Sequence, residues 1–340
     1  MRSHTVILGA GATIAAIPNG DKNGKSSSVM NGLIDKLHMS DVLSGVKLKT
    51  KSKNLEDIYS ELCSKEEYSQ VLKELENRIY DYFSSLELPE EPTVYDYLVL
   101  SLTRNDAIAT FNWDPLLIQA YVRCHNITEN LPHLYCLHGN VAVGYCEHDR
   151  EYGTLDSICP ECGIRFTPTK LLYPIKNKDY NNDPFIRHCW EATEFFIENS
   201  FMLTIFGYSA PNSDTNAVSL LKKAWGDLDN RELEEVSVID IIDEEDMYYK
   251  WSDFIYTHHY NYTNSFFDSY LGKFPRRTCE TIFGTFLMNL FADDTKGFHD
   301  GMSWVEIEEL LKDLIEEENT TPVGKNYKLY YNSSGNDYIE

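Results

Sequence analysis

The stretch that decides the fold is Ala-Ile-Ala-Thr-Phe-Asn-Trp-Asp at residues 107–114, followed by Leu-Tyr-Cys-Leu-His-Gly-Asn at residues 134–140. Each segment starts as a short apolar run, which is typical of a buried strand, and ends in polar side chains. Ligands bind at the carboxyl ends of the strands in open parallel sheets. We therefore expect Asn112, Asp114 and His138 to lie in one site.

Asp114 also has a purely structural interpretation. Pro115 follows it, and proline is favoured at the first position of a helix, so residues 115–124 are expected to form a helix that begins at the site. Asp114 would cap that helix. The sequence leaves both roles open.

A glycine turn near the N-terminus indicates a nucleotide site. Residues 6–8 predict a strand, and Gly9, Ala10 and Gly11 follow it, which is an arrangement that lets a backbone approach a pyrophosphate at a helix N-terminus. Ile14 stands where the dinucleotide fingerprint has its third glycine. A plain tight turn between a strand and a helix is therefore the alternative.

A second turn, at residues 17–21, is expected to loop back over the same ligand. Its candidate ligand-binding residues are Pro18, Asn19 and Asp21. Neither Arg nor Lys occurs between Gly9 and Asp21. A pyrophosphate at this place would be held by backbone N–H groups and dipoles rather than by salt bridges.

Two later strands are also expected to end in candidate ligand-binding residues. Residues 201–206 are wholly apolar and lead into Gly207, Tyr208 and Ser209, after which Asn212 or Ser213 could cap a helix. Residues 236–242 predict another buried strand. Asp240 is its candidate for the ribose hydroxyls, because a carboxylate past a strand end can bind them.

Residues 141–175 predict a zinc-ribbon-like module. Cys159-Pro-Glu-Cys162-Gly has the form of a zinc knuckle. Cys146 and His148 complete the candidate ligand set, although His148 is the weakest member because only one residue separates it from Cys146. The alternative is a module that folds without metal.

The remaining sequence predicts helices around this sheet. Apolar residues at helical spacing predict helices over residues 55–62 and 68–86, within an insertion at residues 22–92. Residues 254–257 predict an edge strand. Residues 261–318 predict a helical C-terminal region, with a capping box at Ser303-Trp-Val-Glu306, and residues 319–340 a polar tail. The fold class is thus α/β, with a Rossmann-like parallel sheet in a domain at residues 1–260.

Composition limits the partners. The chain has 340 residues, of which 30 are basic and 54 are acidic, and the net charge of −24 repels nucleic acids and anionic membranes. No signal peptide and no membrane span are evident, so we expect a cytoplasmic protein. The eight cysteines are then expected as thiols or metal ligands.

The ordered motifs resemble those of the sirtuin (Sir2) superfamily. The motifs that carry the resemblance are Gly9-Ala-Gly-Ala12, Ile17-Pro-Asn19, Thr110-Phe-Asn-Trp-Asp114, Leu137-His-Gly-Asn140, the Cys-x-x-Cys module and Gly207-Tyr-Ser209. The resemblance implies a sirtuin-type fold in which NAD binds between a Rossmann-like domain and a small zinc-and-helix domain. It also implies His138 as the catalytic base, with Asn112 and Asp114 beside the nicotinamide ribose.

Departures from the deacylase pattern point to another reaction. Protein deacylases of this superfamily carry Asp-Phe-Arg where this chain has Asn19-Gly-Asp21, and they carry Gln and Ile where it has Phe111 and Trp113. The chain looks closer to Sir2-like NADases of bacterial antiviral defence. We therefore expect an NAD glycohydrolase that acts in abortive infection.

Two alternatives stay open at this point. They are a protein deacylase or ADP-ribosyltransferase that uses NAD, and a non-catalytic NAD or ADP-ribose sensor. A toxic NADase must be held inactive until it is triggered. We expect it to be held inactive by homo-oligomerisation or by a separately encoded partner such as an ATPase. The C-terminal helical region is expected to make the contact.

Overall fold

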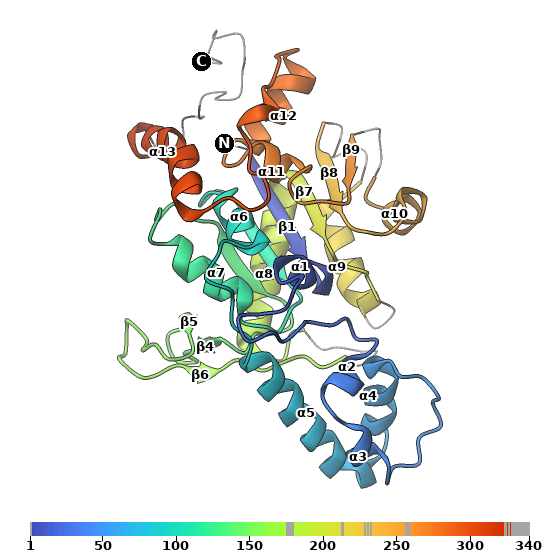
Figure 1. Ribbon diagram of the computed structural model, residues 1–340. Helices are drawn as coiled ribbons and strands as arrows, with labels where there is room; N and C mark the ends of the chain where they lie inside the picture. The colour runs from blue at the N-terminus through green and yellow to red at the C-terminus, as the bar shows by residue number, and fades with distance from the viewer. Residues whose placement is uncertain are drawn as a thin grey trace.

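A six-stranded parallel sheet forms the centre of the computed structural model of the chain (Figure 1). The structure describes residues 2–174, 180–211, 214–227, 229, 231, 233–255, 259–322, 325 and 327. The strands are β1 (Ser3–Leu8), β2 (Ala107–Thr110), β3 (His133–Cys136), β7 (Ser200–Phe206), β8 (Glu235–Ile239) and β9 (Tyr260–Thr263). They lie in the order β3-β2-β1-β7-β8-β9, and all neighbours are parallel. The predicted Rossmann-like sheet is confirmed, with its switch point between β1 and β7.

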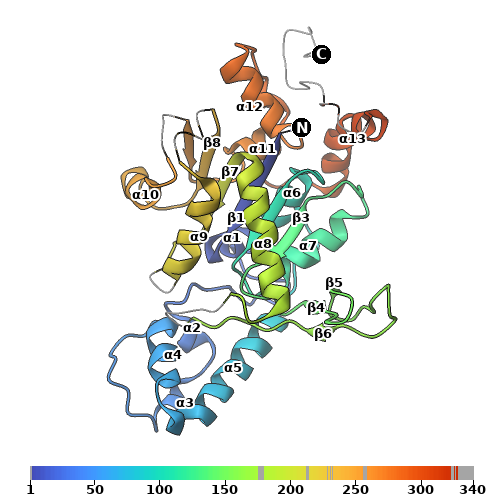
Figure 2. The ribbon, with the colours of Figure 1, turned by 180° about the vertical axis from the view of Figure 1, so that it is seen from behind.

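Helices cover both faces of this sheet because its strands are apolar on both sides. Along β1, Val6 and Leu8 belong to one buried core and Ile7 to the other, as the alternation of side chains in a strand requires. The Ile7 face is covered by α8 (Pro184–Asn199), α9 (Thr215–Trp225) and α10 (Glu244–Trp251), and Figure 2 shows α8 and α9 in front of the strands. The opposite face is covered by α1 (Ala10–Ala16), α6 (Val94–Leu100) and α7 (Leu116–Cys124).

Two insertions lie together beyond one end of the sheet, in the lower part of Figure 1. The first is helical and contains α2 (Leu33–Lys36), α3 (Ser40–Leu43), α4 (Leu55–Cys63), the 3₁₀ turn η1 (Glu66–Tyr68) and α5 (Ser69–Ser84). The second is a small antiparallel sheet of β4 (Val143–Tyr145), β5 (Tyr152–Thr154) and β6 (Thr167–Pro168). The helices expected at 55–62 and 68–86 correspond to α4 and α5.

The C-terminal helices pack on the main core. They are α11 (Tyr270–Lys273), α12 (Thr278–Leu287), the 3₁₀ turn η4 (Asp294–Lys296) and α13 (Trp304–Thr320). Leu271, Ile282 and Leu311 share one buried cluster with Val6. The predicted capping box is present, since Ser303 and Glu306 each bond the other's backbone N–H. Most of the predicted tail at 319–340 lies outside the described residues.

Phe254 and Ile255, the first two residues of the strand expected at 254–257, are not in a strand. Phe254 and Ile255 form a turn after α10, where the amide of Phe254 donates to the carbonyl of Trp251, and the edge strand β9 begins only at Tyr260. Tyr256 and Thr257 lie outside the described residues. Phe254 and Ile255 are apolar because they pack in the core beneath α9 and α10. Within the described part of the chain, no helix has the length and hydropathy needed to cross a membrane.

Candidate active site and metal centre

The register of β2 and β3 brings the predicted strand-end residues to one edge of the sheet. Thr110 lies opposite Cys136, so Asn112 and His138 each lie two residues beyond a paired position. The ring of Phe111, the neighbour of Asn112 in the chain, meets the His138 imidazole edge-on with 4.8 Å between centroids. All three side chains are buried.

Asn112 is anchored to the glycine turn. Its Nδ2 lies 2.8 Å from the Gly9 carbonyl oxygen, 3.0 Å from Thr13 Oγ1 and 3.1 Å from the Tyr95 hydroxyl. These three acceptors use both amide hydrogens. Asn112 is therefore left with its carbonyl oxygen for a ligand, and it can accept a hydrogen bond from a water molecule but cannot donate one.

Asp114 has the structural role that the sequence left open. Its Oδ1 accepts from the amide of Leu116 at 3.1 Å, at the start of α7, and its Oδ2 accepts from the Thr13 hydroxyl at 2.7 Å. Burial raises the pKa of Asp114, and both hydrogen bonds oppose this rise. The carboxylate thus bonds the first amide of α7, whose N-cap is Pro115, and ties the helix to α1, close to Asn112.

The glycines let two loops meet at the switch point. The amide of Gly9 donates to the Phe206 carbonyl at 3.0 Å, and that of Gly11 donates to the Gly207 carbonyl at 2.9 Å. A Cβ on Gly207, whose φ is +60°, would lie 2.4 Å from the backbone nitrogen of Ala12. These glycines serve the close approach of the loops, and the amides of Gly9 and Gly11 are already bonded. Ala10, also predicted to bind the cofactor, starts α1 beside them.

In the second turn, Asp21 is a loop anchor rather than a free ligand. Its Oδ1 accepts from the amides of Asn23 and Lys25, and its Oδ2 accepts from the amide of Glu87. The predicted ligand role for Asp21 is therefore not supported, because three backbone N–H groups occupy the buried carboxylate. Pro18 and Asn19 are exposed.

Residues predicted after β7 and β8 have different environments. Tyr208 is buried, its hydroxyl donates to Asp214 Oδ2 at 3.1 Å and its ring stacks on Phe111 at 4.3 Å. Its side chain is therefore part of the site's framework. Ser209 is exposed, and Asp240 accepts from the amides of Ile241 and Ile242 in its own turn. The predicted caps Asn212 and Ser213 lie outside the described residues.

Two side chains that sequence reasoning missed flank His138. Asp214 Oδ1 lies 3.9 Å from the His138 Nε2, and the ring of Tyr180 lies parallel to the imidazole with 6.2 Å between centroids. The buried Tyr180 hydroxyl has no hydrogen-bond partner among the residues that the structure describes, and burial together with Asp214 raises its pKa. No local motif marked either residue, because both reach the site from distant segments.

The candidate metal centre contains three cysteines and an aspartate. The ligand atoms of Cys146, Asp149, Cys159 and Cys162 all lie within 4.8 Å of one another. The sulfurs of Cys146 and Cys162 are 3.7 Å apart, which fits the roughly 3.8 Å between two sulfurs at Zn–S bonds of about 2.3 Å in a tetrahedral site. Asp149 Oδ2 lies 3.5 Å from the sulfur of Cys146 and 3.3 Å from that of Cys159. This donor set fits Zn²⁺.

The expected ligand His148 is displaced by its neighbour. Its side chain is 80% exposed, and its Nδ1 lies 2.6 Å from Asp149 Oδ1. The turn after β4 directs residue 149, and not residue 148, toward the cysteines. His148 is thus a contact of the fourth ligand rather than a ligand itself.

Comparison with known proteins gives one kind of match. No protein-family model matches the chain, and no curated protein matches it. Among solved structures, a Sir2 homolog–NAD complex matches over 83% of this chain and 90% of its own, at 12% identity and a TM-score of 0.41. A structure described as the basis for the mechanism and regulation of Sir2 enzymes matches over 93% and 94%, at 15% identity and a TM-score of 0.35. At these identities and TM-scores the similarity carries no argument about activity.

The departures from the sirtuin deacylase pattern have structural counterparts. Phe111 lies between His138 and Tyr208. Trp113 meets Phe83 of α5 edge-on at 5.7 Å and Tyr173 at the same distance, which fastens the helical insertion to the end of β2. Both positions are therefore filled by internal aromatic packing.

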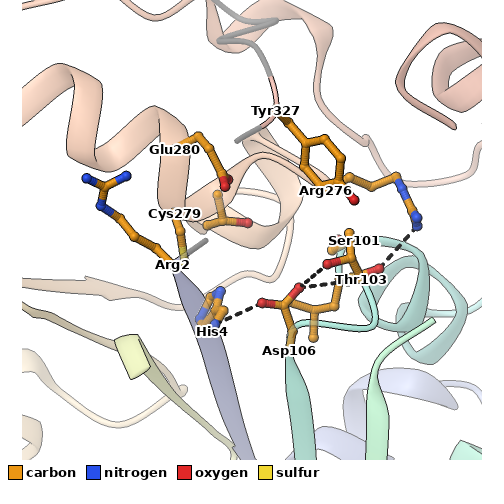
Figure 3. A pocket seen from close by; sticks show the side chains of 11 residues that line it. Arg2, His4, Ser101, Thr103, Asp106, Arg276, Cys279, Glu280 and Tyr327 are labelled. Atoms are coloured by element: carbon orange, nitrogen blue, oxygen red, sulfur yellow. Dashed lines mark hydrogen bonds between the residues drawn. The ribbon is translucent and has the colours of Figure 1, made fainter. Parts of the chain in front are cut away.

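A second polar cluster lies at the opposite edge of the six-stranded sheet, where β1 and β2 begin (Figure 3). Asp106 accepts from the backbone amides of His4 and Thr103. Burial raises the pKa of Asp106 to about 6 and that of Glu280 to about 7, and it lowers the pKa of His4 to about 3. The cavity among them measures about 10 Å³, which is room for about one water molecule.

Proposed function

We propose that the chain is an NAD glycohydrolase, which cleaves NAD to nicotinamide and ADP-ribose. The observation that carries the proposal is the 2.8 Å contact between the Asn112 amide and the Gly9 carbonyl. It joins a strand-end polar residue to the glycine turn at the switch point, the place where α/β sheets bind dinucleotides. The motif resemblance to sirtuins agrees with this reading.

The reaction suits the groups at this edge. Nicotinamide leaves the ribose as a neutral molecule, so no general acid is needed, and the protein must place a water beneath C1′ and stabilise an oxocarbenium-like sugar. The side-chain carbonyl oxygen of Asn112, which accepts no hydrogen bond from the residues that the structure describes, can accept one from that water. His138 can take a proton from it or from a ribose hydroxyl. The buried Asp114 adds negative charge nearby.

The cofactor-contact residues are part of the same proposal. Ala10, Pro18, Asn19 and Ser209 border the two turns at the switch point, with Asp240 at the end of the next strand. Zinc, held by the three cysteines and Asp149, would be structural. It would keep the small antiparallel sheet folded and would take no part in the cleavage.

The test is incubation of the purified chain with NAD while nicotinamide is followed by chromatography. We expect turnover without any acceptor, and a loss of about 10²- to 10⁴-fold in His138→Ala. The matched control is His133→Ala, an exposed residue at the other end of β3. Asn112→Ala should also lose activity, while the exposed Asn126→Ala should not.

Other outcomes would replace the proposal. NAD loss that requires an acylated peptide would identify a deacylase, and loss that requires an acceptor protein would identify an ADP-ribosyltransferase. Thermal stabilisation by NAD without turnover would identify a sensor; one-site binding at a hundredfold excess over Kd stabilises by about 2.7 kcal/mol.

A role in anti-phage defence is proposed from the resemblance and has its own test. Cells that carry the wild-type chain with any partner it needs should lose NAD after phage infection, and cells that carry His138→Ala should not. We propose that the NADase activity is regulated by self-assembly through the C-terminal region. It is supported by Phe286, Met288 and Phe291, which are between 48% and 69% exposed at the end of α12. Replacing Phe286 and Phe291 by Ser should dissociate an oligomer measured by light scattering.

A further inference from the structure

The strongest relationship outside the predicted site joins His138 to Asp214. The two residues are 76 positions apart in the sequence, one after β3 and the other directly before α9. The His138 Nε2 lies 3.9 Å from Asp214 Oδ1, and both side chains are 6% exposed. This separation is that of an ion pair rather than of a direct hydrogen bond.

Asp214 is held in place from its other side. The Tyr208 hydroxyl donates to Asp214 Oδ2 at 3.1 Å, and the Asp214 amide donates to the Pro211 carbonyl at 2.8 Å. Tyr208 is itself fixed, because its ring stacks on Phe111 at an interplanar angle of 9°. One carboxylate oxygen is thus bonded by the protein framework while the other faces the imidazole.

The imidazole is held between aromatic rings. Phe111 meets it edge-on and Tyr180 lies parallel to it at 6°. Apolar rings on both sides keep water away and strengthen the interaction between the imidazole and a carboxylate. Among the residues that the structure describes, the titratable groups on the elements packed around His138 are Asp214 and Tyr208 before α9, Tyr180 before α8, Asp114 after β2 and Cys136 on β3.

We propose that Asp214 is a positioning residue for His138. It faces Nε2, so a proton on Nε2 is directed toward the carboxylate, and Nδ1 is the ring nitrogen that takes up the proton in the reaction. In the proposed NAD cleavage, on which this inference rests for its chemistry, an O–H bond of the attacking water or of a ribose hydroxyl breaks as the N–H bond at Nδ1 forms. The carboxylate then balances the positive charge of the imidazolium, as an orienting carboxylate does for a catalytic histidine elsewhere.

The decisive variant is Asp214→Asn in the full chain, measured in two ways. The first is the histidine NMR signal that disappears in His138→Gln, followed as a function of pH. The second is the rate of NAD cleavage across pH. Without the carboxylate the charged imidazole is less favoured, so we expect His138 to titrate at lower pH. We also expect kcat to fall by about 10²-fold or more, with the acid limb of the rate profile moved to lower pH.

Two further variants separate charge from structure. Asp214→Glu keeps the negative charge and should retain the titration of His138 close to that of the wild type. Asp246→Asn removes an exposed carboxylate in the first turn of α10, and should change neither readout. A circular-dichroism melt of each variant confirms that it is folded.

The NMR readout keeps this inference distinct from the proposed function. A lower titration of His138 in Asp214→Asn supports the pairing even if the chain does not cleave NAD, in which case only the proposed function fails. If the titration of His138 and the pH profile of NAD cleavage are unchanged in Asp214→Asn, the pairing is overturned. An unchanged titration alone overturns it if the chain does not cleave NAD.

Discussion

Arg276 Nε donates to Glu318 Oε1 at 2.7 Å, and both side chains are at most 1% exposed. Arg277 Nη1 donates to the same oxygen at 2.7 Å, and Asn130 Nδ2 donates to the other one at 2.6 Å. Arg276 also reaches the carbonyl oxygens of Leu102 and Asn130. This buried network joins the end of α13 to the loops at the foot of the sheet, so the C-terminal helices are part of the structural core of the sheet domain.

Glu318→Ala is therefore expected to destabilise the whole fold. Removing one partner of a buried ion pair leaves uncompensated charge, here on Arg276, and typically costs about 3–5 kcal/mol. Arg277 keeps its ion pair with Glu317. Denaturant unfolding followed by tryptophan fluorescence measures this loss. The control is Asp156→Ala, which breaks an ion pair with Arg165 that is 71–97% exposed and should cost less than about 1 kcal/mol. Equal losses in the two variants would contradict the prediction.

Gly207→Ala should separate the two loops at the switch point. The new methyl group would lie 2.4–2.6 Å from backbone atoms of Gly11 and Ala12, which cannot move aside cheaply. Gly301→Ala is the matched control, because its φ is +77° and nothing lies near the added carbon. Both variants should lose about 1 kcal/mol from the left-handed backbone, and Gly207→Ala should lose more. A calorimetric comparison that found no difference would show that the loop contact is unimportant.

Glu280 predicts a pH dependence of stability. Its pKa is raised by burial from 4.5 to about 7, so the folded chain binds this proton more tightly than the unfolded chain does. Stability is therefore lost as the pH rises from about 4.5 to about 7, by about 3 kcal/mol for this group alone. In Glu280→Gln that loss should disappear when the free energy of unfolding is compared at pH 5 and pH 8. The exposed Glu308→Gln should keep the behaviour of the wild type.

Zinc binding distinguishes the observed ligand set from the expected one. Cys159→Ser and Asp149→Ala should both reduce the zinc content of the purified chain, measured by mass spectrometry, below the approximately one ion of a structural site. His148→Ala should keep its zinc, because the imidazole points to solvent. Zinc loss in His148→Ala with retention in Asp149→Ala would restore the histidine as the fourth ligand.

Local patterns in the sequence were sufficient to predict the individual helices and strands. The apolar runs at 107–110 and 201–206, the helical spacing at 55–62 and the capping box at Ser303 depend on residues within a few positions of one another. The local pattern at Phe254 and Ile255 predicted a strand, but these two apolar residues pack in a turn. Burial beneath a helix and burial in a strand select the same residue types, so the pattern could not distinguish them.

By itself, therefore, the sequence determined which residues stand at the strand ends, since side-chain type and spacing are local properties. Only the tertiary structure decided which donor and acceptor atoms of each polar group remain for a ligand. The amide hydrogens of Asn112 bond α1, α6 and the glycine turn, and the carboxylate of Asp21 accepts hydrogen bonds from a loop. Asp149 replaces His148, and Asp214 reaches His138 from 76 residues away. Hydrogen-bond partners are chosen by packing across the whole chain, and no pattern along the sequence records that choice.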